Sequence, residues 1–361
     1  MKIRKANYED YNKIKELHIK NNIKILEENN WVNLWKQNPL IKNLDSNFPI
    51  GWVLEEKEKI VGYLGNIIKE YYYENKKIIV ACSNGWVVNK KYRLESLSLI
   101  NIFFSQENID IFITTTPNKA TEKIFLRYGA KKIPLKDYDE NLFLILNVEK
   151  FFDSLFKYRK ILSIKILKSI IVKLFKIIFY NRLNYWKKFS QKKKINFHNN
   201  FDKTFENFWN EFKNKNNKFM QSKSPNWLNW HIKNLKDVWA VSISENNIIK
   251  GYALCCERNN NHYQLKRVSI LDVVSIEDNK AIYLSLINSC IKKSYDRGYH
   301  VIDMIGTSNM KKKMFSKFKT FKRKVLNVLF YYYSKDSHLS NILTNENVWD
   351  TTLLDGDSFL I

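Results

Sequence analysis

Apolar and polar residues recur with two different periods along the first 150 residues of the chain. Alternating or continuous apolar runs, typical of strands, occupy residues 2–6, 51–56, 59–73, 76–88, 109–116 and 141–149. Apolar residues three and four positions apart, typical of helices, occupy residues 8–22, 93–106 and 118–129. Because hairpins precede a strand–helix–strand crossover, this order predicts a mixed sheet with helices on its faces.

The same landmarks return in the second half of the chain, in the same order and at a nearly constant distance. The matched positions are Trp52 with Trp239, Gly62 with Gly251, Leu97 with Leu284 and Asn118 with Asn309. Their separations are 187, 189, 187 and 191 residues, and the pentapeptide LSLIN begins at both leucines. Four ordered matches favour an internal duplication. We therefore predict two α/β domains, at residues 1–150 and 198–361, with a connector at residues 151–197.

The amino-acid composition supports two folded domains. The 361 residues are 45% apolar and 15% aromatic, with only 9 glycines and 5 prolines. Such a chain has enough apolar side chains for two cores and too few turn residues for a many-stranded sandwich. The composition therefore excludes low-complexity and collagen-like classes.

The net charge of +25 is concentrated in one segment of the chain. Residues 150–197 contain fourteen lysines and arginines and a single acid. Wound as a helix, Lys165, Lys168, Lys173 and Lys176 fall within an arc of about 140°, and apolar residues fill the rest. Three interpretations stay open: a linker helix docked on a flanking domain, a helix at a membrane surface, or a nucleic-acid contact. The scarcity of arginine and the lack of a nucleic-acid motif make the last the weakest.

No local pattern indicates a metal site or a disulfide framework. The cysteines, at Cys82, Cys255, Cys256 and Cys290, have no paired spacing, and the six histidines are scattered. The first seventeen residues are charged throughout and lack the apolar core of a secretory signal. We therefore expect no metal and a cytoplasmic protein, held at the inner membrane surface if the connector binds lipid.

Three segments carry a resemblance to a known superfamily. They are IRKANYEDYNKIKELH at residues 3–18, VVNKKYRLESLSLINIFF at 87–104 and TTPNKATEKIFLRYGA at 115–130. In this order they resemble the GNAT superfamily of acyl-CoA-dependent N-acyltransferases, and the doubled organisation is also similar to tandem GNAT and FemABX-type transferases. The resemblance implies an α/β (α+β) fold of two GNAT-like mixed-sheet domains, joined here by the basic amphipathic segment. It also implies acetyl-CoA or another acyl-CoA as co-substrate.

The resemblance assigns the acyl-CoA site residue by residue. In this family a turn at the start of the central helix holds the pyrophosphate through its amides, and a helix N-terminus suits a dianion. The matching turn is Arg93, Leu94, Glu95, Ser96, Leu97 and Ser98, with serines where the family has glycines. Val87 and Val88 match the strand that offers its backbone to the pantetheine arm, and Asn118 matches an asparagine at the edge of the same cleft.

The catalytic residues depart from the family pattern. The general-acid tyrosine position, four residues before Gly129, is Phe125, and Tyr128 does not take its place. We assign candidate catalytic roles to Asp272 and Asn118, since a carboxylate can bind or deprotonate an amine. The terminal segment adds further carboxylates, at Asp350, Asp355 and Asp357.

Three hypotheses about function follow. The first is an acyl-CoA-dependent N-acyltransferase that acylates an amine of a small molecule or saccharide, such as an amino sugar or a polysaccharide or cell-envelope precursor. In it the first domain binds the donor, and the acceptor lies between the domains. The alternatives are a catalytically degenerate GNAT-fold binding protein and a FemABX-like transferase that uses aminoacyl-tRNA. In the last case the basic connector is expected to contact RNA, with a steep dependence on salt.

Overall fold

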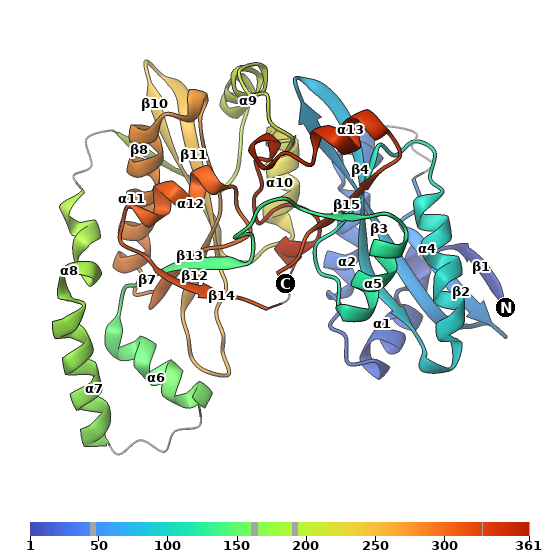
Figure 1. The fold of residues 1–361 in the computed structure, drawn as a ribbon, viewed down its shortest axis with the longest axis horizontal. Coiled ribbons are helices and arrows are strands. Elements are labelled where there is room, and N and C mark those ends of the chain that lie inside the picture. Colours follow the sequence, from blue (N-terminus) through green and yellow to red (C-terminus); the bar gives the residue numbers. More distant parts are fainter. Residues whose placement is uncertain (44–47, 160–164, 190–193, 327, 361) are drawn as a thin grey trace.

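Two mixed sheets stand side by side, and the C-terminal end of the chain lies between them (Figure 1). The computed structural model describes residues 1–361 apart from 44–47, 160–164, 190–193, 327 and 361. Helices cover the faces of both sheets (Figure 1). The predicted class, two mixed α/β sheets joined by a basic helical segment, is confirmed.

The first sheet is built mainly from the first half of the chain. In spatial order its strands are β1 (Lys2–Lys5), β2 (Gly51–Glu56), β3 (Lys59–Tyr73), β4 (Lys76–Val88), β5 (Ile111–Thr114), β15 (Tyr331–Ser334) and β6 (Lys131–Lys132), and β9 (Met220–Gln221) pairs with β3. The helices of this half are α1 (Tyr11–Lys20), α2 (Glu28–Lys36), α3 (Pro39–Asn43), α4 (Ser96–Phe104) and α5 (Lys119–Arg127), with the 3-10 turns η1 (Tyr8–Asp10) and η2 (Lys90–Glu95). Strands β4 and β5 are parallel, and α4 forms the crossover between them.

The second sheet repeats this order position by position. Its strands are β8 (Ile195–His198), β10 (Val238–Glu245), β11 (Ile248–Glu257), β12 (Arg267–Ser275), β13 (Val301–Met304), β7 (Glu140–Ile145) and β14 (Phe321–Lys324). The helices of this half of the chain are α9 (Thr204–Asn214), α10 (Pro225–Lys233), α11 (Lys280–Asp296), α12 (Asn309–Ser316) and α13 (Ser337–Ile342), with the 3-10 turns η4 (Ile276–Asp278), η5 (Glu346–Val348) and η6 (Ser358–Leu360). Of these, α13 lies on the first sheet, beside β15 (Figure 1). Strands β12 and β13 are parallel, as β4 and β5 are.

The halves of the chain exchange strands: the first half contributes β7 to the second sheet, and the second half contributes β9 and β15 to the first. Strand β7, expected from the sequence to close the first sheet, pairs instead with β13 and β14 of the second. Strand β15 in turn lies between β5 and β6 of the first sheet. An apolar run predicts that a strand forms, but it does not specify which edge the strand pairs with. The internal duplication and its domain boundaries stay a prediction.

Two helices rich in tryptophan pack the halves against each other. Trp31 and Trp35 lie on α2 with ring centroids 4.8 Å apart, and Trp227 and Trp230 lie on α10 at 5.4 Å. All four side chains are buried in one continuous core. The indole N–H of Trp230 donates to the carbonyl of Leu34 over 3.2 Å. The contact between α2 and α10 therefore joins the two halves.

The described part of the basic connector contains three helices on the outer side of the second sheet (Figure 1). They are α6 (Val148–Arg159), α7 (Lys165–Ile178) and α8 (Tyr180–Leu183), followed by the 3-10 turn η3 (Tyr185–Lys188). One face of α7 docks through Val172 and Phe175, whose ring lies 5.0 Å from Phe152 of α6 and 5.9 Å from Phe321 of β14. Within the described part of the chain, no helix is both long enough and apolar enough to cross a membrane.

Candidate functional site

The parallel strands β4 and β5 separate after a short pairing. Only Val80–Cys82 pairs with Ile111–Ile113, while β4 continues to Val88. Beyond the pairing, no strand among the described residues borders β4 on this side. Gly85 and Trp86 form a bulge there, because together they face one residue of β3. Alternate amides of this β4 edge face the gap, where an extended ligand could pair with them.

A C-terminal strap, defined as residues 350–360, occupies this gap. The Asp357 carboxylate accepts hydrogen bonds from the hydroxyls of Thr115 at 2.7 Å and Thr116 at 2.9 Å, and from the Asn84 amide at 3.1 Å. It therefore bridges the two separating strands. Burial raises the pKa of Asp357, although these three hydrogen bonds oppose the shift. Gly356 has φ +58°, and a Cβ there would lie 2.4 Å from Thr115, so only glycine fits.

A buried lysine and a second carboxylate lie beside Asp357. The ammonium group of Lys69 donates to the carbonyl of Leu354 at 2.7 Å and to Gln221 Oε1 at 3.4 Å. Burial lowers the pKa of Lys69 to about 8. Tyr71 donates its hydroxyl to Asp355 over 2.8 Å, and burial raises the pKa of Asp355. A lysine and two aspartates with shifted pKa values therefore lie close together at the strap.

Two lysines and two aspartates form a second buried cluster, which anchors the start of the strap to the second sheet. Lys311 of α12 lies 2.6 Å from Asp272 and 2.8 Å from Asp350, and Lys223 lies 2.9 Å and 3.6 Å from the same carboxylates. Burial alone would raise the pKa of Asp350, but Lys311 and Lys223 hold it well below its usual range. The two positive and two negative charges balance, so each buried charge is stabilised by its partners in the cluster.

The turn predicted to hold a diphosphate, at residues 93–98, spans the end of the 3-10 turn η2 and the first residues of α4. The amides of Lys91 and Tyr92 donate to the Asn89 side chain at 3.3 Å and to the Asn89 carbonyl at 2.8 Å. The amide of Ser96 donates to the carbonyl of Arg93. Of the predicted turn, the Ser96 amide is therefore already used within the protein. The assignment of the turn to acyl-CoA stays a prediction.

The other residues predicted for the donor site lie at the end of β4 and in the turn that follows it. Val87 and Val88 pair with β3 at the end of β4. The side chains of the turn are exposed at Arg93, Leu94 and Leu97 and half-buried at Glu95, Ser96 and Ser98.

The two predicted catalytic residues lie in different halves. Asn118 caps α5, where its side-chain oxygen accepts from the amides of Ala120 at 2.9 Å and Thr121 at 3.0 Å. Asp272 lies in the second sheet with one oxygen on each lysine of the buried cluster. Both side chains therefore have structural partners, and the structure does not bring them together.

Phe125, at the position where the family has tyrosine, is 1% exposed. Its ring lies 6.3 Å from that of Trp86 on the bulge of β4. Tyr128 points away and donates its hydroxyl to Asn101. Neither aromatic residue offers an acid inside the gap.

The carboxylates of the strap were candidates from the sequence, but the lysines that contact the strap were not. The chain has 52 lysines, and their composition gives no reason to single out Lys69, Lys223 or Lys311. One signal was available, because Lys69 interrupts the continuous apolar run of β3. A charged residue within such a run is rarely buried without a partner.

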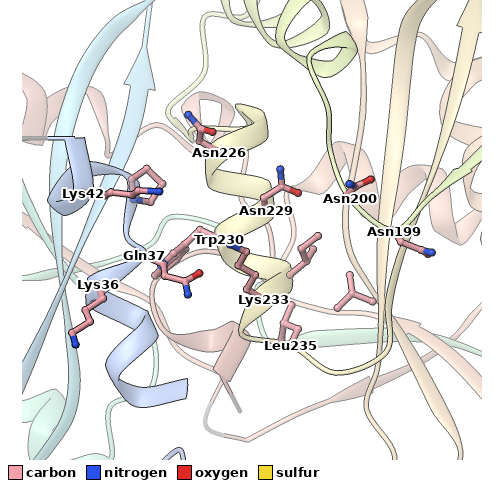
Figure 2. Close-up of a pocket in the computed structure, with 13 residues that line it drawn as sticks. Lys36, Gln37, Lys42, Asn199, Asn200, Asn226, Asn229, Trp230, Lys233 and Leu235 are labelled. Atoms are coloured by element: carbon pink, nitrogen blue, oxygen red, sulfur yellow. The ribbon is translucent and has the colours of Figure 1, made fainter. Parts of the chain in front are cut away.

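A polar pocket of about 880 Å³ lies where α2 and α3 of the first half meet α10 of the second. Figure 2 shows α10 in the middle, with Lys36, Gln37 and Lys42 on one side and Asn199 and Asn200 on the other. The buried Gln37 Oε1 has no hydrogen-bond partner among the described residues. We call this the α10 pocket; carboxamides and lysines dominate its lining.

The comparisons with known proteins agree on the fold. No family model and no curated protein matches the sequence. Among solved structures, a GCN5-related N-acetyltransferase from Anabaena variabilis matches 93% of this chain and 73% of its own, at 10% identity and a TM-score of 0.55. A Saccharomyces cerevisiae N-myristoyltransferase with bound myristoyl-CoA matches 92% of this chain and 78% of its own, at 11% identity and a TM-score of 0.55. A putative acetyltransferase from Pyrococcus horikoshii matches 97% of this chain and 93% of its own, at 11% identity and a TM-score of 0.51. The chain therefore has the GNAT fold.

Proposed function

We propose that the chain is an acyl-CoA-dependent N-acyltransferase. The observation that carries this is Asp357, a buried carboxylate held between the separating strands β4 and β5 of a GNAT fold. The acceptor nitrogen attacks the thioester carbonyl, the C–N bond forms as the C–S bond breaks, and coenzyme A leaves as the thiolate. Asp357 takes the proton from the amine. Burial favours this role because it raises the pKa of Asp357 towards the working pH of a general base.

The donor is acetyl-CoA or a longer acyl-CoA, bound by the first half of the chain. The amides of β4 near Val87 and Val88 face the gap and pair with the pantetheine arm. Because amides of the following turn are already used, its contact with the diphosphate comes from side chains, above all the exposed Arg93. This assignment keeps residues 1–150 as the donor domain and 198–361 as a second, degenerate domain.

The acceptor is an amine on a saccharide that also carries an anionic group, and it binds in the α10 pocket. Carboxamides both donate and accept hydrogen bonds, as a polyhydroxylated ligand requires. Lysines 36, 42 and 233 supply positive charge for an anion. Trp230 lines the pocket, and its ring lies 5.5 Å from Phe359 of the strap and 5.5 Å from the ammonium group of Lys69. The acceptor amine therefore passes the Trp230 ring to reach Asp357 on the strap.

One observation favours a second candidate function, a GNAT-fold protein that binds a ligand without turnover. The buried Phe125 stands where the family has its acid tyrosine, and the Asp357 carboxylate is already engaged by three hydrogen bonds within the protein. A protein with this arrangement could retain the scaffold after losing the reaction. Binding and turnover therefore need to be measured separately.

The test is calorimetry of the chain with acetyl-CoA and myristoyl-CoA, combined with an assay for free thiol after addition of amino sugars and nucleotide-linked amino sugars. We expect saturable binding of an acyl-CoA and thiol release that requires the amine. Arg93→Gln should weaken acyl-CoA binding at least ~10-fold through loss of a charged contact to phosphate. Arg127→Gln, an exposed position on α5, is the matched control and should bind as the wild type does. Binding without thiol release supports the second candidate, and no binding refutes the acyltransferase.

We also infer that the connector binds the surface of an anionic membrane. Ile170, Leu174, Ile177 and Ile178 form one stripe on α7, opposite its docked face, and are 48%, 52%, 72% and 69% exposed. Lys173 lies exposed beside the stripe, and further lysines follow α8. Apolar side chains flanked by lysines are typical of helices that lie in a membrane interface.

Vesicles of phosphatidylglycerol should carry the wild-type chain to the top of a flotation gradient. Ile177→Ser with Ile178→Ser should reduce the floated fraction at least ~10-fold, because two apolar side chains no longer enter the lipid. Leu126→Ser with Leu326→Ser changes two exposed leucines elsewhere and should float as the wild type does. Equal flotation of the two double variants would remove α7 as the contact.

A further inference from the structure

A cavity on the second sheet collects four of the nine arginines of the chain. Its volume is about 570 Å³, and Arg159 of α6, Arg258, Arg267 and Arg323 line it. Lysines are more than five times as frequent as arginines in this sequence, yet no described lysine lines this cavity. Among the described lining residues, Asp303 supplies the only carboxylate. The cavity therefore has an excess of positive charge, in guanidinium form.

The base of the cavity is held in a fixed arrangement around Asp303. This carboxylate accepts from the hydroxyl of Ser269 at 2.5 Å and from the Asn141 amide at 3.2 Å, and it pairs with Arg267 at 3.5 Å. These contacts join β12, β13 and β7, so the exchanged strand is needed to form the base. The base is consequently preorganised before a ligand arrives.

One buried acceptor at this base lacks a partner. Asn141 is 2% exposed, and its Nδ2 donates to Asp303. Its Oδ1 has no hydrogen-bond partner among the described residues, although the residue lines the cavity. A buried carbonyl oxygen without a donor costs free energy, and a ligand that supplies a hydroxyl or an N–H recovers it.

The arginines divide into two that are tied to the protein and two at the rim. Arg258 donates to the carbonyl of Phe359 at 3.1 Å, and Arg267 donates to the carbonyl of Arg258 at 3.2 Å. Arg159 and Arg323 are exposed and form no ion pair with any residue that the structure describes. Their planar side chains are consequently available to a ligand that enters the cavity.

We propose that this cavity binds a phosphorylated ligand that also carries hydroxyl groups, such as a sugar phosphate or a nucleotide. The fork of a guanidinium group matches two oxygens of a phosphate, which a lysine ammonium group does not. The Asn141 oxygen accepts a ligand hydroxyl, and the volume suits a molecule of this size. Because the cavity lies on the other sheet from Asp357, this site does not depend on the proposed acyl transfer.

The experiment is calorimetry of the full chain with uridine diphosphate, inorganic pyrophosphate and uridine. We expect uridine diphosphate and pyrophosphate to bind, and uridine to show no saturable binding. Arg159→Gln with Arg323→Gln should weaken the binding of both phosphorylated probes at least ~10-fold. The control, Lys123→Gln with Arg127→Gln on α5, removes the same charge from exposed positions and should leave both affinities unchanged.

Three outcomes overturn the proposal. The first is equal affinity of the two double variants for uridine diphosphate. The second is an absence of binding by the wild type to both phosphorylated probes at millimolar concentration. The third is binding of uridine as tight as that of uridine diphosphate, which would make the phosphate irrelevant. Melting curves of both double variants check that the fold is retained. We expect it to be, because substitutions at exposed positions change stability little.

Discussion

Replacing Asp272 with asparagine should lower the free energy of unfolding by about 3–5 kcal/mol. The carboxylate contacts the ammonium groups of Lys223 and Lys311, and all three side chains are buried. The asparagine leaves two buried positive charges with Asp350 as their one remaining carboxylate in the cluster. Removing one member of a buried ionic cluster costs more than the cluster contributes as a whole, because the partners keep their desolvation penalty.

Urea unfolding at pH 7 measures this loss. Asp296→Asn, at an exposed position near the end of α11, should change stability by no more than about 0.5 kcal/mol. A loss of less than about 1 kcal/mol in Asp272→Asn would contradict the ionic role.

The same cluster predicts the response to acid. The folded pKa of Asp350 lies below its unfolded value of about 3.9, so its stabilisation is present above that value and is lost as the pH falls below it.

Asp357→Asn should reduce kcat/KM for amine acylation by about 10²–10⁴-fold, because the variant retains the shape of the side chain but cannot accept a proton. In the wild type the rate should rise with pH through the pKa of Asp357, which burial holds above its usual value. The variant should lose this acidic limb. The assay is thiol release from acyl-CoA as a function of pH, with Asp296→Asn as the control.

Gly356→Ala provides an independent check on the position of the strap. The added Cβ meets the side chain of Thr115 at 2.4 Å, and φ is +58° at this residue. We expect the strap to shift away from β5, at a cost of about 1–3 kcal/mol in stability, and the rate to fall as it does in Asp357→Asn. Full activity in both variants would show that Asp357 is a structural bridge and not the base.

Strand and helix positions were predictable to the extent that they depend on local pattern. The runs at residues 51–56, 59–73 and 76–88 coincide with β2, β3 and β4, since hairpin strands with short turns find their partners nearby. The sequence placed β7 in the first sheet, whereas β7 pairs with β13 of the second. Its apolar residues lie on both faces, so the pattern does not specify the sheet to which it belongs. Pairing between remote strands is decided by shape complementarity over the whole core.

The candidate site was predicted less well than the fold. The strap aspartates were candidates for binding or deprotonating an acceptor, but the lysines that contact the strap are remote in the chain. Lys311 and Lys223 precede Asp350 by 39 and 127 residues, and Lys69 precedes Leu354 by 285 residues. The turn at Arg93 was identified by resemblance, whereas the hydrogen bonds that close it depend on Asn89 and on the helical path of the backbone. Local spacing has no information about such long-range contacts.

The sequence by itself determined the α/β class, the order of most strands and helices, and the basic helical connector, because hydrophobic periodicity and charge are local properties of a chain. The tertiary structure alone decided the exchange of β7 and β15, the burial of three lysines, and the seating of Asp357 between β4 and β5. These features arise only when residues hundreds of positions apart are desolvated together, so that each buried charge or hydrogen-bonding group must find its partner across the fold.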